Sequence, residues 1–545
     1  MINNRNSRKA HADTVAHDNM NDTLQPILTD SSDFPEMRRK GCVYVDKTAY
    51  FHKLLLGPDS RFFIARPRRF GKSLMISTFK AIFEGRRELF DGLAISKTDW
   101  TWEKYPVLYF NFGFAASPSA AEFMMNFPSA VRTSLENAGA EYDKDDSPSA
   151  NFGRAIDKLA ATSDGKGVVI LIDEYDDPVA QLLDKPDEAE AVRGMLASFY
   201  RQMKDRTGSI RFLMITGVSK FTKMSVFSAL SNLSDLSLRK EYATMLGYTE
   251  DELDTYFDGH MRAHAAKMQM DYGAYREELK RWFNGYRFGK SVTETVYNPV
   301  SIGVNLALQE PYFQPCWAQT GKAVMLMKYF QKEDFLAIDM DSVKNMREED
   351  FDVTDIRALK PVPMLYQTGY LTIDDFNPHT GMYTLRVPDE EVRRDLATVT
   401  SAVAARQDTY WVSQLGGKLL TAQWDEFFIG LKLLYAALPY GSTEQNVHEV
   451  SFERNLVVLL WSQGVRCTTE DRQANGQADV VAIHPCGVYI FELKVDESAE
   501  AALDQVKKKG YDAPYHGRGL PIWLIGLNFD RQTRHLMDAK AVQVS

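Results

Sequence analysis

Short apolar runs separated by stretches of helical pattern recur from Phe34 to about Leu246. Four of these runs, rich in β-branched and aromatic residues, cover positions 62–64, 107–110, 168–172 and 212–215. Continuous apolar runs of this length, spaced by helices, are typical of parallel strands that are buried on both faces. The pattern therefore predicts an α/β unit with a parallel sheet over residues 34–248.

A helical pattern dominates the middle of the chain. Thr249-Glu250-Asp251-Glu252 is a capping box, which predicts the start of a helix. Near residue 370, two alternating segments at 370–373 and 382–385 flank a Pro/Gly turn, so a hairpin is expected there. We expect a helical lid and connector over 249–438, and the interpretation of the hairpin as the wing of a winged-helix-like fold stays open.

The two ends of the chain differ from this pattern. Residues 1–30 contain no aromatic residue, and this polar segment predicts a disordered arm over 1–33. A linker-like stretch at 438–442 introduces a last unit at 441–545. In that unit two β-rich runs flank His484-Pro485-Cys486-Gly487, which predicts an antiparallel hairpin.

Composition narrows the class of protein. With about 150 residues per domain, a chain of 545 residues is long enough for three to four domains. The formal net charge of −10 excludes a basic coat over the whole molecule, and a local basic groove stays open. Four cysteines without a CxxC pair argue against a disulfide scaffold and fit a reducing compartment. Because no apolar run approaches the ~18 residues of a membrane span and the first residues lack the apolar core of a signal peptide, we expect a cytoplasmic protein with no membrane partner.

A phosphate-binding loop is predicted directly after the first apolar run. The loop and the first residue behind it read Arg66-Pro67-Arg68-Arg69-Phe70-Gly71-Lys72-Ser73-Leu74. In a strand–loop–helix of this kind, backbone N–H groups meet the phosphates, Lys72 reaches the β/γ oxygens and Ser73 ligates Mg²⁺. Arg66 stands where the usual first glycine would be. The three arginines are expected to neutralise phosphate charge or to act as an arginine finger, with a basic surface loop as the alternative.

The second half of the nucleotide site is predicted at the end of the third run. Asp173 and Glu174 follow the apolar positions 168–172, so they should lie at the carboxyl edge, where ligands sit in open α/β sheets. Asp173 is expected to hold the Mg²⁺ ion and Glu174 to polarise the attacking water. The fourth run leads to Ser219, which either senses the γ-phosphate or forms part of a turn.

Further short motifs accompany the loop. Within residues 34–246 they are Tyr44-Val45-Asp46-Lys47-Thr48, Leu171-Ile172-Asp173-Glu174-Tyr175-Asp176 and Ile215-Thr216-Gly217-Val218-Ser219-Lys220-Phe221. Later in the chain they are Asn284-Gly285-Tyr286, Tyr297-Asn298-Pro299 and Gly369-Tyr370-Leu371. Together with the loop, these motifs resemble the AAA-ATPase-like family of bacterial and archaeal proteins that carries a nuclease-like domain at its C-terminus. The resemblance implies an additional-strand P-loop fold that binds ATP and Mg²⁺, and Arg66 belongs to the family pattern.

The C-terminal hairpin places acids opposite each other. With the turn centred between Pro485 and Cys486, the facing pairs are Ile483 with Val488, Val481 with Ile490, and Asp479 with Glu492. Like charges directly across a strand pair are destabilising, and a bound divalent cation would compensate them. Lys494 lies two residues beyond Glu492 and therefore on the same face of its strand.

This arrangement resembles the PD-(D/E)xK nuclease superfamily, which has a restriction-endonuclease-like αβ fold. The resemblance implies that Asp479 and Glu492 hold Mg²⁺ or Mn²⁺ and that Lys494 orients the nucleophile. A preceding helix should add an acid, Glu453 in preference to Glu449. The following helix supplies Gln505, and its lysines at 507–509 are candidates to meet backbone phosphates. Gly476-Gln477 departs from the Gly-Arg that family members often show.

We therefore expect an ATPase with a Mg²⁺-dependent nuclease that processes DNA or RNA under ATP control. The alternative is a nucleotide-switched signalling or interaction protein whose nuclease-like domain does not cleave. The C-terminal unit at 441–545 contains 14 acidic against 11 basic residues, so metal or another domain must supply part of any attraction to nucleic acid. A homo-oligomer stays open.

Overall fold

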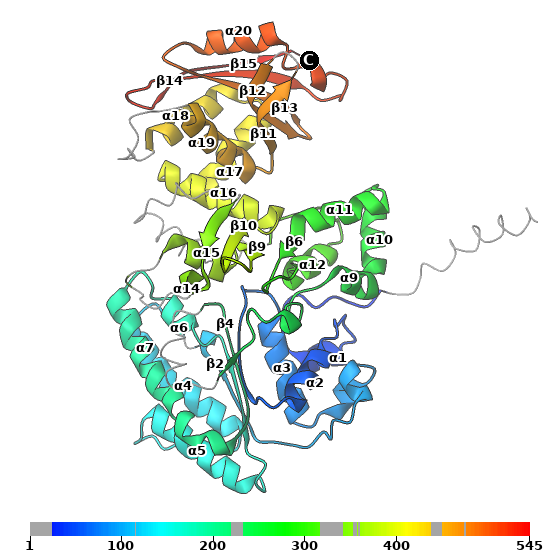
Figure 1. The fold of residues 1–545 in the computed structure, drawn as a ribbon, viewed down its shortest axis with the longest axis vertical. Helices are drawn as coiled ribbons and strands as arrows, with labels where there is room; N and C mark the ends of the chain where they lie inside the picture. Colours follow the sequence, from blue (N-terminus) through cyan, green and yellow to red (C-terminus); the bar gives the residue numbers. More distant parts are fainter. Residues whose placement is uncertain are drawn as a thin grey trace, which may run out of the picture.

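The computed structural model describes residues 24–114, 116–219, 233–316, 342–351, 357, 360–437, 449–473 and 476–544. Figure 1 shows three parts that follow the order of the sequence. The N-terminal unit lies at the bottom of the view, the helical middle lies above it, and the C-terminal unit lies at the top with α20 on its outer side.

A five-stranded parallel sheet forms the centre of the N-terminal unit. Its strands are β1 (Arg61–Ala65), β2 (Val107–Asn111), β3 (Val168–Asp173), β4 (Ile210–Gly217) and β5 (Ser234–Asp235). They lie side by side in the order β2-β3-β4-β1-β5, and every neighbouring pair is parallel. Because β4 is inserted between β1 and β3, the predicted additional-strand P-loop fold is confirmed. Every residue of β3 is buried, as a strand covered by helices on both faces requires.

Helices cover both faces of this sheet. They are α1 (Phe34–Arg39), α2 (Thr48–Leu56), α3 (Lys72–Phe83), α4 (Ala120–Asn137), α5 (Pro148–Thr162), α6 (Asp177–Ala180) and α7 (Pro186–Arg201). Short 3₁₀ turns are η1 (Arg87–Phe90), η2 (Ala94–Lys97), η3 (Phe112–Phe114), η4 (Lys204–Ser209) and η5 (Lys240–Tyr242). Helix α3 follows Gly71, whose φ of 85° lies in the left-handed region that favours glycine. This glycine lets the chain turn sharply from the loop into the helix.

The segment before α1 differs from its prediction. Residues 24–33 were assigned to a disordered arm, but Ile27 packs against the core of the lid helices and Pro26 O accepts a hydrogen bond from Val43 N at 2.9 Å. Aliphatic side chains anchor this segment, so the lack of aromatic residues was a misleading signal. Residues 1–23 lie outside the described part of the chain.

The first half of the middle region, residues 249–306, is mostly helical and is referred to below as the lid. It contains α9 (Glu250–Tyr256), α10 (Asp258–Lys267), α11 (Tyr272–Phe283), β6 (Asn284–Tyr286), β7 (Val296–Tyr297) and α12 (Pro299–Leu306). The predicted capping box is confirmed, because Glu252 N donates to Thr249 Oγ1 at 3.3 Å and Thr249 N donates to Glu252 Oε2 at 2.9 Å.

The second half of the middle region carries a small sheet and three longer helices. Its elements are β8 (Val343–Met346), α14 (Glu348–Phe351), α15 (Pro361–Thr368), β9 (Thr372–Asn377), β10 (Met382–Arg386), α16 (Glu390–Ala405), α17 (Thr409–Leu420) and α18 (Trp424–Ala437). The predicted hairpin is β9–β10, and β8 joins it in an antiparallel sheet of order β8-β10-β9. The predicted linker at 438–442 lies outside the described residues.

A mixed sheet forms the C-terminal unit. Its elements are α19 (Glu449–Ser462), β11 (Arg466–Gln473), β12 (Gly476–His484), β13 (Gly487–Val495), α20 (Ala499–Lys509), η9 (Ala513–Tyr515), β14 (Ile522–Phe529) and β15 (Leu536–Gln543). The strands run in sequence order across the sheet, and only β13 and β14 are parallel. Alternate hairpin residues enter two different cores, one with α19 and one with α20, so both faces of the sheet are covered. This is the expected αβ architecture.

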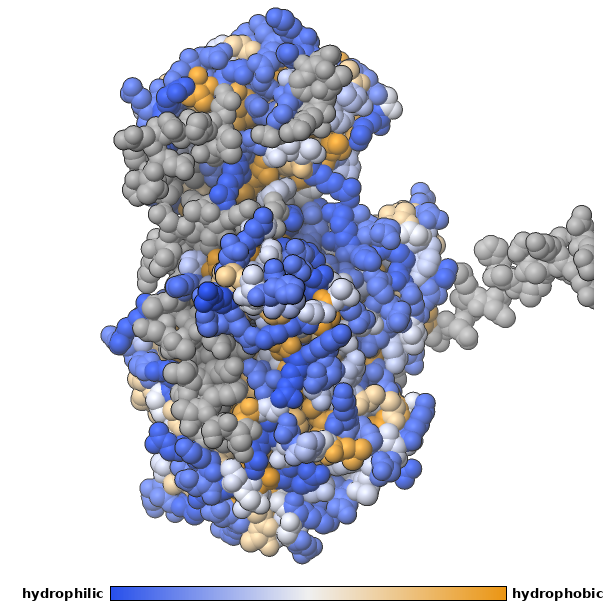
Figure 2. All heavy atoms as spheres, in the orientation of Figure 1, coloured by the Kyte–Doolittle hydropathy of each residue, from blue (hydrophilic) through white to orange (hydrophobic). Residues whose placement is uncertain are grey.

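The outer surface is mostly hydrophilic on the face shown in Figure 2, with scattered apolar residues. Among the helices of the described ranges, none is long and apolar enough to cross a membrane.

Candidate functional site: a phosphate cradle and an acidic hairpin

Lys72 is a buried cation at the first position of α3, directly behind the loop that follows β1. Its ammonium group donates to the carbonyl oxygens of Arg66 at 2.9 Å and Pro67 at 2.8 Å. Burial lowers the pKa of Lys72 to about 8, while the charges of Asp173 and Glu174 act in the opposite direction. The loop therefore folds around a cation at the carboxyl edge of the sheet, where it can meet an anion.

Asp173 ends β3 beside Lys72 and is completely buried. Its Oδ1 accepts hydrogen bonds from the Thr216 hydroxyl on β4 and from Glu174 N, the latter at 3.1 Å. Its Oδ2 is buried and has no hydrogen-bond partner. A buried carboxylate oxygen is costly without a partner, so this atom is suited to a cation. The sequence motif at 215–221 contained Thr216, but it did not indicate this contact with Asp173.

Glu174 follows Asp173 in a left-handed conformation with φ of 53°. Burial, and then the neighbouring charges of Asp173 and Asp177, raise the pKa of its carboxyl group. The carboxylate lies directly over Gly113, where an added Cβ would be 1.8 Å from Glu174 Oε2 and 3.1 Å from Asn111 Oδ1. A glycine at this position thus leaves the space that the Glu174 carboxylate occupies.

Ser219 lies two residues beyond the end of β4 and is held by residues that follow β3. Asp176 Oδ2 accepts hydrogen bonds from Ser219 N at 2.6 Å and from the Ser219 hydroxyl. The Tyr175 hydroxyl donates to Ser219 O at 3.0 Å. These contacts tie Ser219 to the turn that follows Asp173. Lys220 lies outside the described residues.

The three arginines of the loop have different environments. Arg66 is 2% exposed and donates to main-chain carbonyls, among them Ser237 O at 2.7 Å. Arg68 forms an ion pair with Asp177. Arg69 donates to Cys316 O at 2.9 Å and so contacts the middle region. The structure thus brings the side chains of Arg68 and Asp177 together and directs Arg66 into the protein interior.

The remaining loop residues lie close to the lid. Phe70 packs edge-on against Tyr286 and Phe288, with ring centroids 4.7 and 5.1 Å away. Ser73 is half-buried in the first turn of α3. Leu74 and Gly71 line a hollow that is open to solvent, and its other walls include residues 43–45, Lys47 and residues 245–248.

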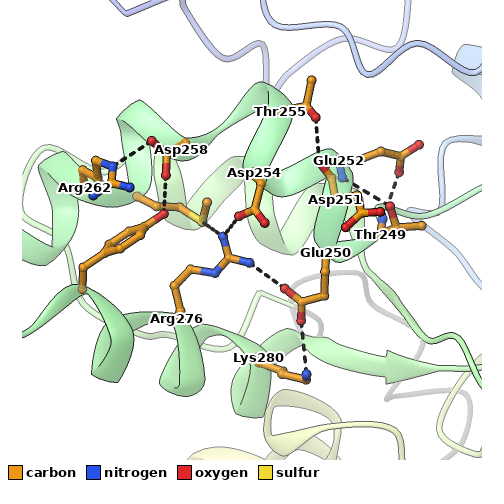
Figure 3. Close-up of polar contacts among 12 residues, drawn as sticks. Thr249, Glu250, Asp251, Glu252, Asp254, Thr255, Asp258, Arg262, Arg276 and Lys280 are labelled. Carbon is orange, nitrogen blue, oxygen red and sulfur yellow. Dashed lines mark hydrogen bonds and ion pairs between the residues drawn. The ribbon is translucent and has the colours of Figure 1, made fainter.

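A polar network fixes the lid beside this hollow (Figure 3). Glu250, the first residue of α9, accepts hydrogen bonds from Tyr297 at 2.7 Å and Asn284 at 3.2 Å, and it pairs with Arg276 at 2.7 Å. Lys47 reaches the same helix through an ion pair of 2.6 Å with Glu252. Lys47, Asn284 and Tyr297 belong to three of the motifs noted in the sequence. Their contacts converge on the start of α9 and hold the lid against the N-terminal unit.

The second site lies on the C-terminal hairpin. Glu492 on β13 is 1% exposed, its Oε1 lies 3.4 Å from Lys494 Nζ, and it accepts a hydrogen bond from Gln505 on α20. Asp479 on β12 accepts a hydrogen bond from Leu493 N at 2.7 Å. Asp479, Glu492, Lys494 and Gln505 are therefore held on one part of the hairpin and its following helix.

The strand register agrees with the prediction up to a point. The pairs Ile483 with Val488 and Val481 with Ile490 are confirmed. The regular pairing ends with Val480 opposite Phe491, and Asp479 binds the backbone of β13 through its side chain instead of forming the next regular pair. The backbone N–H of Leu493 thus compensates part of the negative charge of Asp479. The sequence analysis expected a bound cation to provide all of this compensation.

The other predicted residues of this unit are placed as follows. Glu453 is half-buried on α19, which packs against β11, β12 and β13. The side chain of Glu449 lies outside the described residues. Gln477 N donates to the Tyr511 hydroxyl at 3.2 Å, and Lys507, Lys508 and Lys509 are exposed on α20.

Neither site has enough side-chain ligands to fill the coordination shell of a metal ion. Within the described ranges, no group of three or more His, Cys, Asp or Glu residues is arranged to hold a metal ion. Magnesium sites with one or two carboxylates take their remaining ligands from water and from substrate phosphates. Asp173 with Ser73, and Asp479 with Glu492, fit that kind of donor set.

Known protein families match both end units of the chain. Residues 29–227 match the family described as "Predicted AAA-ATPase", and residues 447–539 match the "PD-(D/E)XK nuclease superfamily". The chain is similar to the "Uncharacterized protein in vnfD 5'region" of Azotobacter chroococcum mcd 1, at 32% identity over 511 residues that cover 91% of this chain and 94% of that protein. The structure of the Aeropyrum pernix ORC2 protein in ADPNP-ADP complexes is similar at 12% identity with a TM-score of 0.23, covering 68% of this chain and 92% of that chain. The chain therefore belongs to the same family as this Azotobacter protein, with a predicted AAA-ATPase domain at residues 29–227 and a PD-(D/E)XK nuclease superfamily domain at residues 447–539.

Proposed function

We propose that this protein binds and hydrolyses ATP with Mg²⁺ at the loop of residues 66–74, and that the nucleotide controls a metal-dependent nuclease site on the C-terminal hairpin. The observation that carries the proposal is the convergence of Lys72, Glu174 and the unsatisfied Oδ2 of Asp173 at one edge of the sheet. A cation, a carboxylate oxygen free for a metal and a carboxylate with a raised pKa are the groups that phosphoryl transfer to water requires.

The nucleotide would lie along the start of α3. Lys72 would exchange the carbonyl oxygens of Arg66 and Pro67 for phosphate oxygens, which are better partners for a buried ammonium group. The backbone N–H groups after Gly71 and the Ser73 hydroxyl would complete the phosphate contacts. The base would lie against the open hollow beside Leu74 and Tyr248, and the lid network around Glu250 would hold its wall in place.

Glu174 is the group that would polarise the attacking water. Its raised pKa makes it a stronger base than an ordinary glutamate, and the neighbouring Asp173 disfavours a second negative charge. The hydrogen bond from Thr216 fixes one oxygen of Asp173 and leaves the other for Mg²⁺, which would neutralise charge on the phosphates.

At the hairpin, Asp479 and Glu492 would hold Mg²⁺ or Mn²⁺, which supplies an activated water and neutralises the scissile phosphate. Lys494, 3.4 Å from Glu492 Oε1, would hold the nucleophile and stabilise the developing charge. Gln505 orients the Glu492 carboxylate from α20. Glu453 and the exposed lysines at 507–509 are proposed to contribute an additional acid and phosphate contacts.

A continuous set of contacts supports control of the hairpin by ATP. Arg69 in the loop donates to Cys316 O at 2.9 Å, and Cys316 N donates to Glu391, a completely buried residue in the first turn of α16. The Ser301 hydroxyl on α12 donates to the same carboxylate at 2.6 Å. Phosphates that attract Arg69 would weaken its bond to Cys316 and so change the position of α16.

Helix α16 then contacts the C-terminal unit. It lies between the small sheet of the middle region and α19 (Figure 1). The guanidinium of Arg394 lies 4.1 Å from the Trp282 ring centroid and donates to Gly464 O at 3.4 Å, and Arg393 lies 4.9 Å from the Trp461 ring centroid. A movement of α16 would therefore reach α19, which carries Glu453.

Cleavage of plasmid and single-stranded DNA and of RNA, with Mg²⁺ or Mn²⁺ and with or without ATP, tests this function. We expect metal-dependent cleavage in the wild type, loss of cleavage in Asp479→Asn, and a change in rate when ATP is added. Retained ATP turnover with no cleavage of any substrate would contradict the nuclease half and favour a nucleotide-switched binding protein.

A further inference from the structure

Strand β15 is an open edge of the C-terminal sheet. Among the residues that the structure describes, it pairs with β14 on one side and has no strand neighbour on the other. The opposite edge differs, because Arg466 at the start of β11 forms an ion pair of 3.3 Å with Glu278 of the lid. An edge strand of eight residues presents a row of unpaired backbone N–H and C=O groups, which are a template for another strand.

The backbone groups that β15 turns outward belong to alternate residues. Val544 N donates to Ile522 O at 3.0 Å, so the N–H group of Val544 points towards β14. The pairing with β14 is regular from 538 to 543, and the direction of the backbone groups alternates along a strand. The N–H and C=O groups of Ala539, Ala541 and Gln543 therefore point away from β14, where a further strand would bind them.

Two opposite charges lie on the face of β15 that α20 covers. Asp538 Oδ2 accepts a hydrogen bond from Ala499 N at 3.0 Å, and Lys540 forms an ion pair with Glu500. Asp538 and Lys540 are nevertheless exposed. Charges on an edge strand usually prevent it from pairing with other chains. Here they have opposite signs and are two residues apart, so an antiparallel copy of the same strand would set them opposite each other.

We propose that β15 pairs with β15 of a second copy of this chain, about a two-fold axis through Ala539. In this antiparallel pair Ala539 faces its own copy, and Asp538 of each chain faces Lys540 of the other. Because Ala539 is an outward-bonding position, its N–H group would donate to the C=O group of Ala539 in the second copy. The Asp538 and Lys540 pairs would then lie at positions without backbone hydrogen bonds, where facing side chains are closest.

The two charges select this register. A pair centred on Ala541 would also use outward backbone groups, but it would set Lys540 opposite the apolar Val542. A pair centred on Gln543 would leave both charges without a partner residue across the axis. Within the regular part of the strand, the centre at Ala539 is the one that sets opposite charges against each other, and two-fold symmetry repeats each favourable contact.

Helix α18 adds an apolar surface beside this edge. It packs on β15 through a core that Ala539 and Ala541 also contact. On its outer side Ile429 and Leu433, one turn apart, are 61% and 52% exposed. Because α18 covers the edge strand, the two copies of α18 would come side by side across the axis and bury these side chains.

The dimer would join the two C-terminal sheets through their β15 strands. It would carry two copies of the Asp479 and Glu492 pair, one on each side of the axis. The contact buries neither the loop at 66–74 nor the hairpin of β12 and β13, so the inference depends on neither ATP hydrolysis nor nucleic-acid cleavage.

Analytical ultracentrifugation of the full-length protein without nucleotide tests the pairing. We expect a reversible monomer–dimer equilibrium in the wild type. Asp538→Lys would set lysines opposite each other and Lys540→Asp would do the same with aspartates, so each variant should raise the Kd of the dimer about tenfold or more. An equimolar mixture of the two variants should dimerise again, because every facing pair is then a lysine with an aspartate.

Three results would overturn the proposal. They are a wild-type protein that stays monomeric at its highest soluble concentration, dimers that persist in both charge variants, and a mixture of the folded variants that fails to dimerise.

Two further variants make the test independent of the charged positions. Ile429→Ser removes an exposed apolar side chain without changing the strand, so it should raise the Kd of the dimer even if the charge variants fold poorly. Lys97→Asp makes the same change of charge at an exposed position of the N-terminal unit, and this matched control should dimerise as the wild type does. Wild-type dimerisation of Ile429→Ser would contradict the proposed interface.

Discussion

Gly113→Ala is the substitution that most directly tests how Glu174 is positioned. The backbone of Gly113 is not in the left-handed region, so alanine is conformationally acceptable there. Its Cβ, however, would lie 1.8 Å from Glu174 Oε2, whereas ordinary contacts begin near 3.4 Å. The carboxylate must therefore withdraw by more than an ångström. Since the obstructed atom is the end of a flexible side chain, the fold should tolerate the change.

The expected effect is on turnover and not on nucleotide binding. A misplacement of 1 Å costs a catalytic group about 100-fold in rate, which is about 2.7 kcal/mol at 1.36 kcal/mol per tenfold. Lys72 and the loop are not displaced, so the Kd for a non-hydrolysable ATP analogue should change less than threefold, as roughly expected for a site with its phosphate contacts intact. Steady-state phosphate release and equilibrium titration measure the two quantities.

Two controls separate this explanation from a general loss of structure. Gly194→Ala on α7 adds a Cβ with nothing within 4 Å and should leave both quantities unchanged. The double variant Gly113→Ala/Glu174→Gln should be no slower than Glu174→Gln alone, because both changes remove the same interaction. Wild-type turnover in Gly113→Ala, or additive losses in the double variant, would refute the role of Glu174 as the water-polarising base.

Three further predictions concern pH, metal and coupling. The kcat/KM for ATP should rise with pH as the Glu174 carboxyl, whose pKa is raised, ionises. It should fall again above the pKa of about 8 at which Lys72 loses its charge. A flat profile from pH 5 to about 9 would contradict both assignments. Mn²⁺ should raise the melting temperature of the wild-type chain more than that of Asp479→Asn, because the variant lacks one carboxylate of the proposed site; calorimetry with equal shifts would argue against that site. Arg69→Ala removes the bond to Cys316, so ATP should no longer alter hydrogen exchange in α16, and a response equal to that of the wild type would exclude this route.

The sequence was informative where the parts of a site are close together in the chain. The loop at 66–73, the acids that end β3 and the hairpin of β12 and β13 follow from local pattern, and the structure has each of them. A buried parallel strand is a continuous apolar run, and strand alternation fixes which side chains share a face. The predicted fold class is confirmed on these elements.

Sequence reasoning failed where a role depends on distant partners. Arg66 was grouped with the other loop arginines, but its acceptors, Ser237 and Tyr242, come from a segment much later in the chain. Strand β5 has two residues, too few for a periodic pattern. The link from Asp479 to the backbone of Leu493 and the bond from Thr216 to Asp173 depend on strand spacing that one sequence does not specify.

The central claim is that ATP controls the hairpin site, and one comparison tests it most directly. Glu174→Gln should hold ATP without turnover, whereas Lys72→Ala should not bind it. Cleavage of the same DNA substrate by the two variants, at saturating ATP and Mg²⁺, should differ about tenfold, which corresponds to about 1.4 kcal/mol of coupling. Equal cleavage rates in the two variants would contradict the claim and show that the two domains are only tethered.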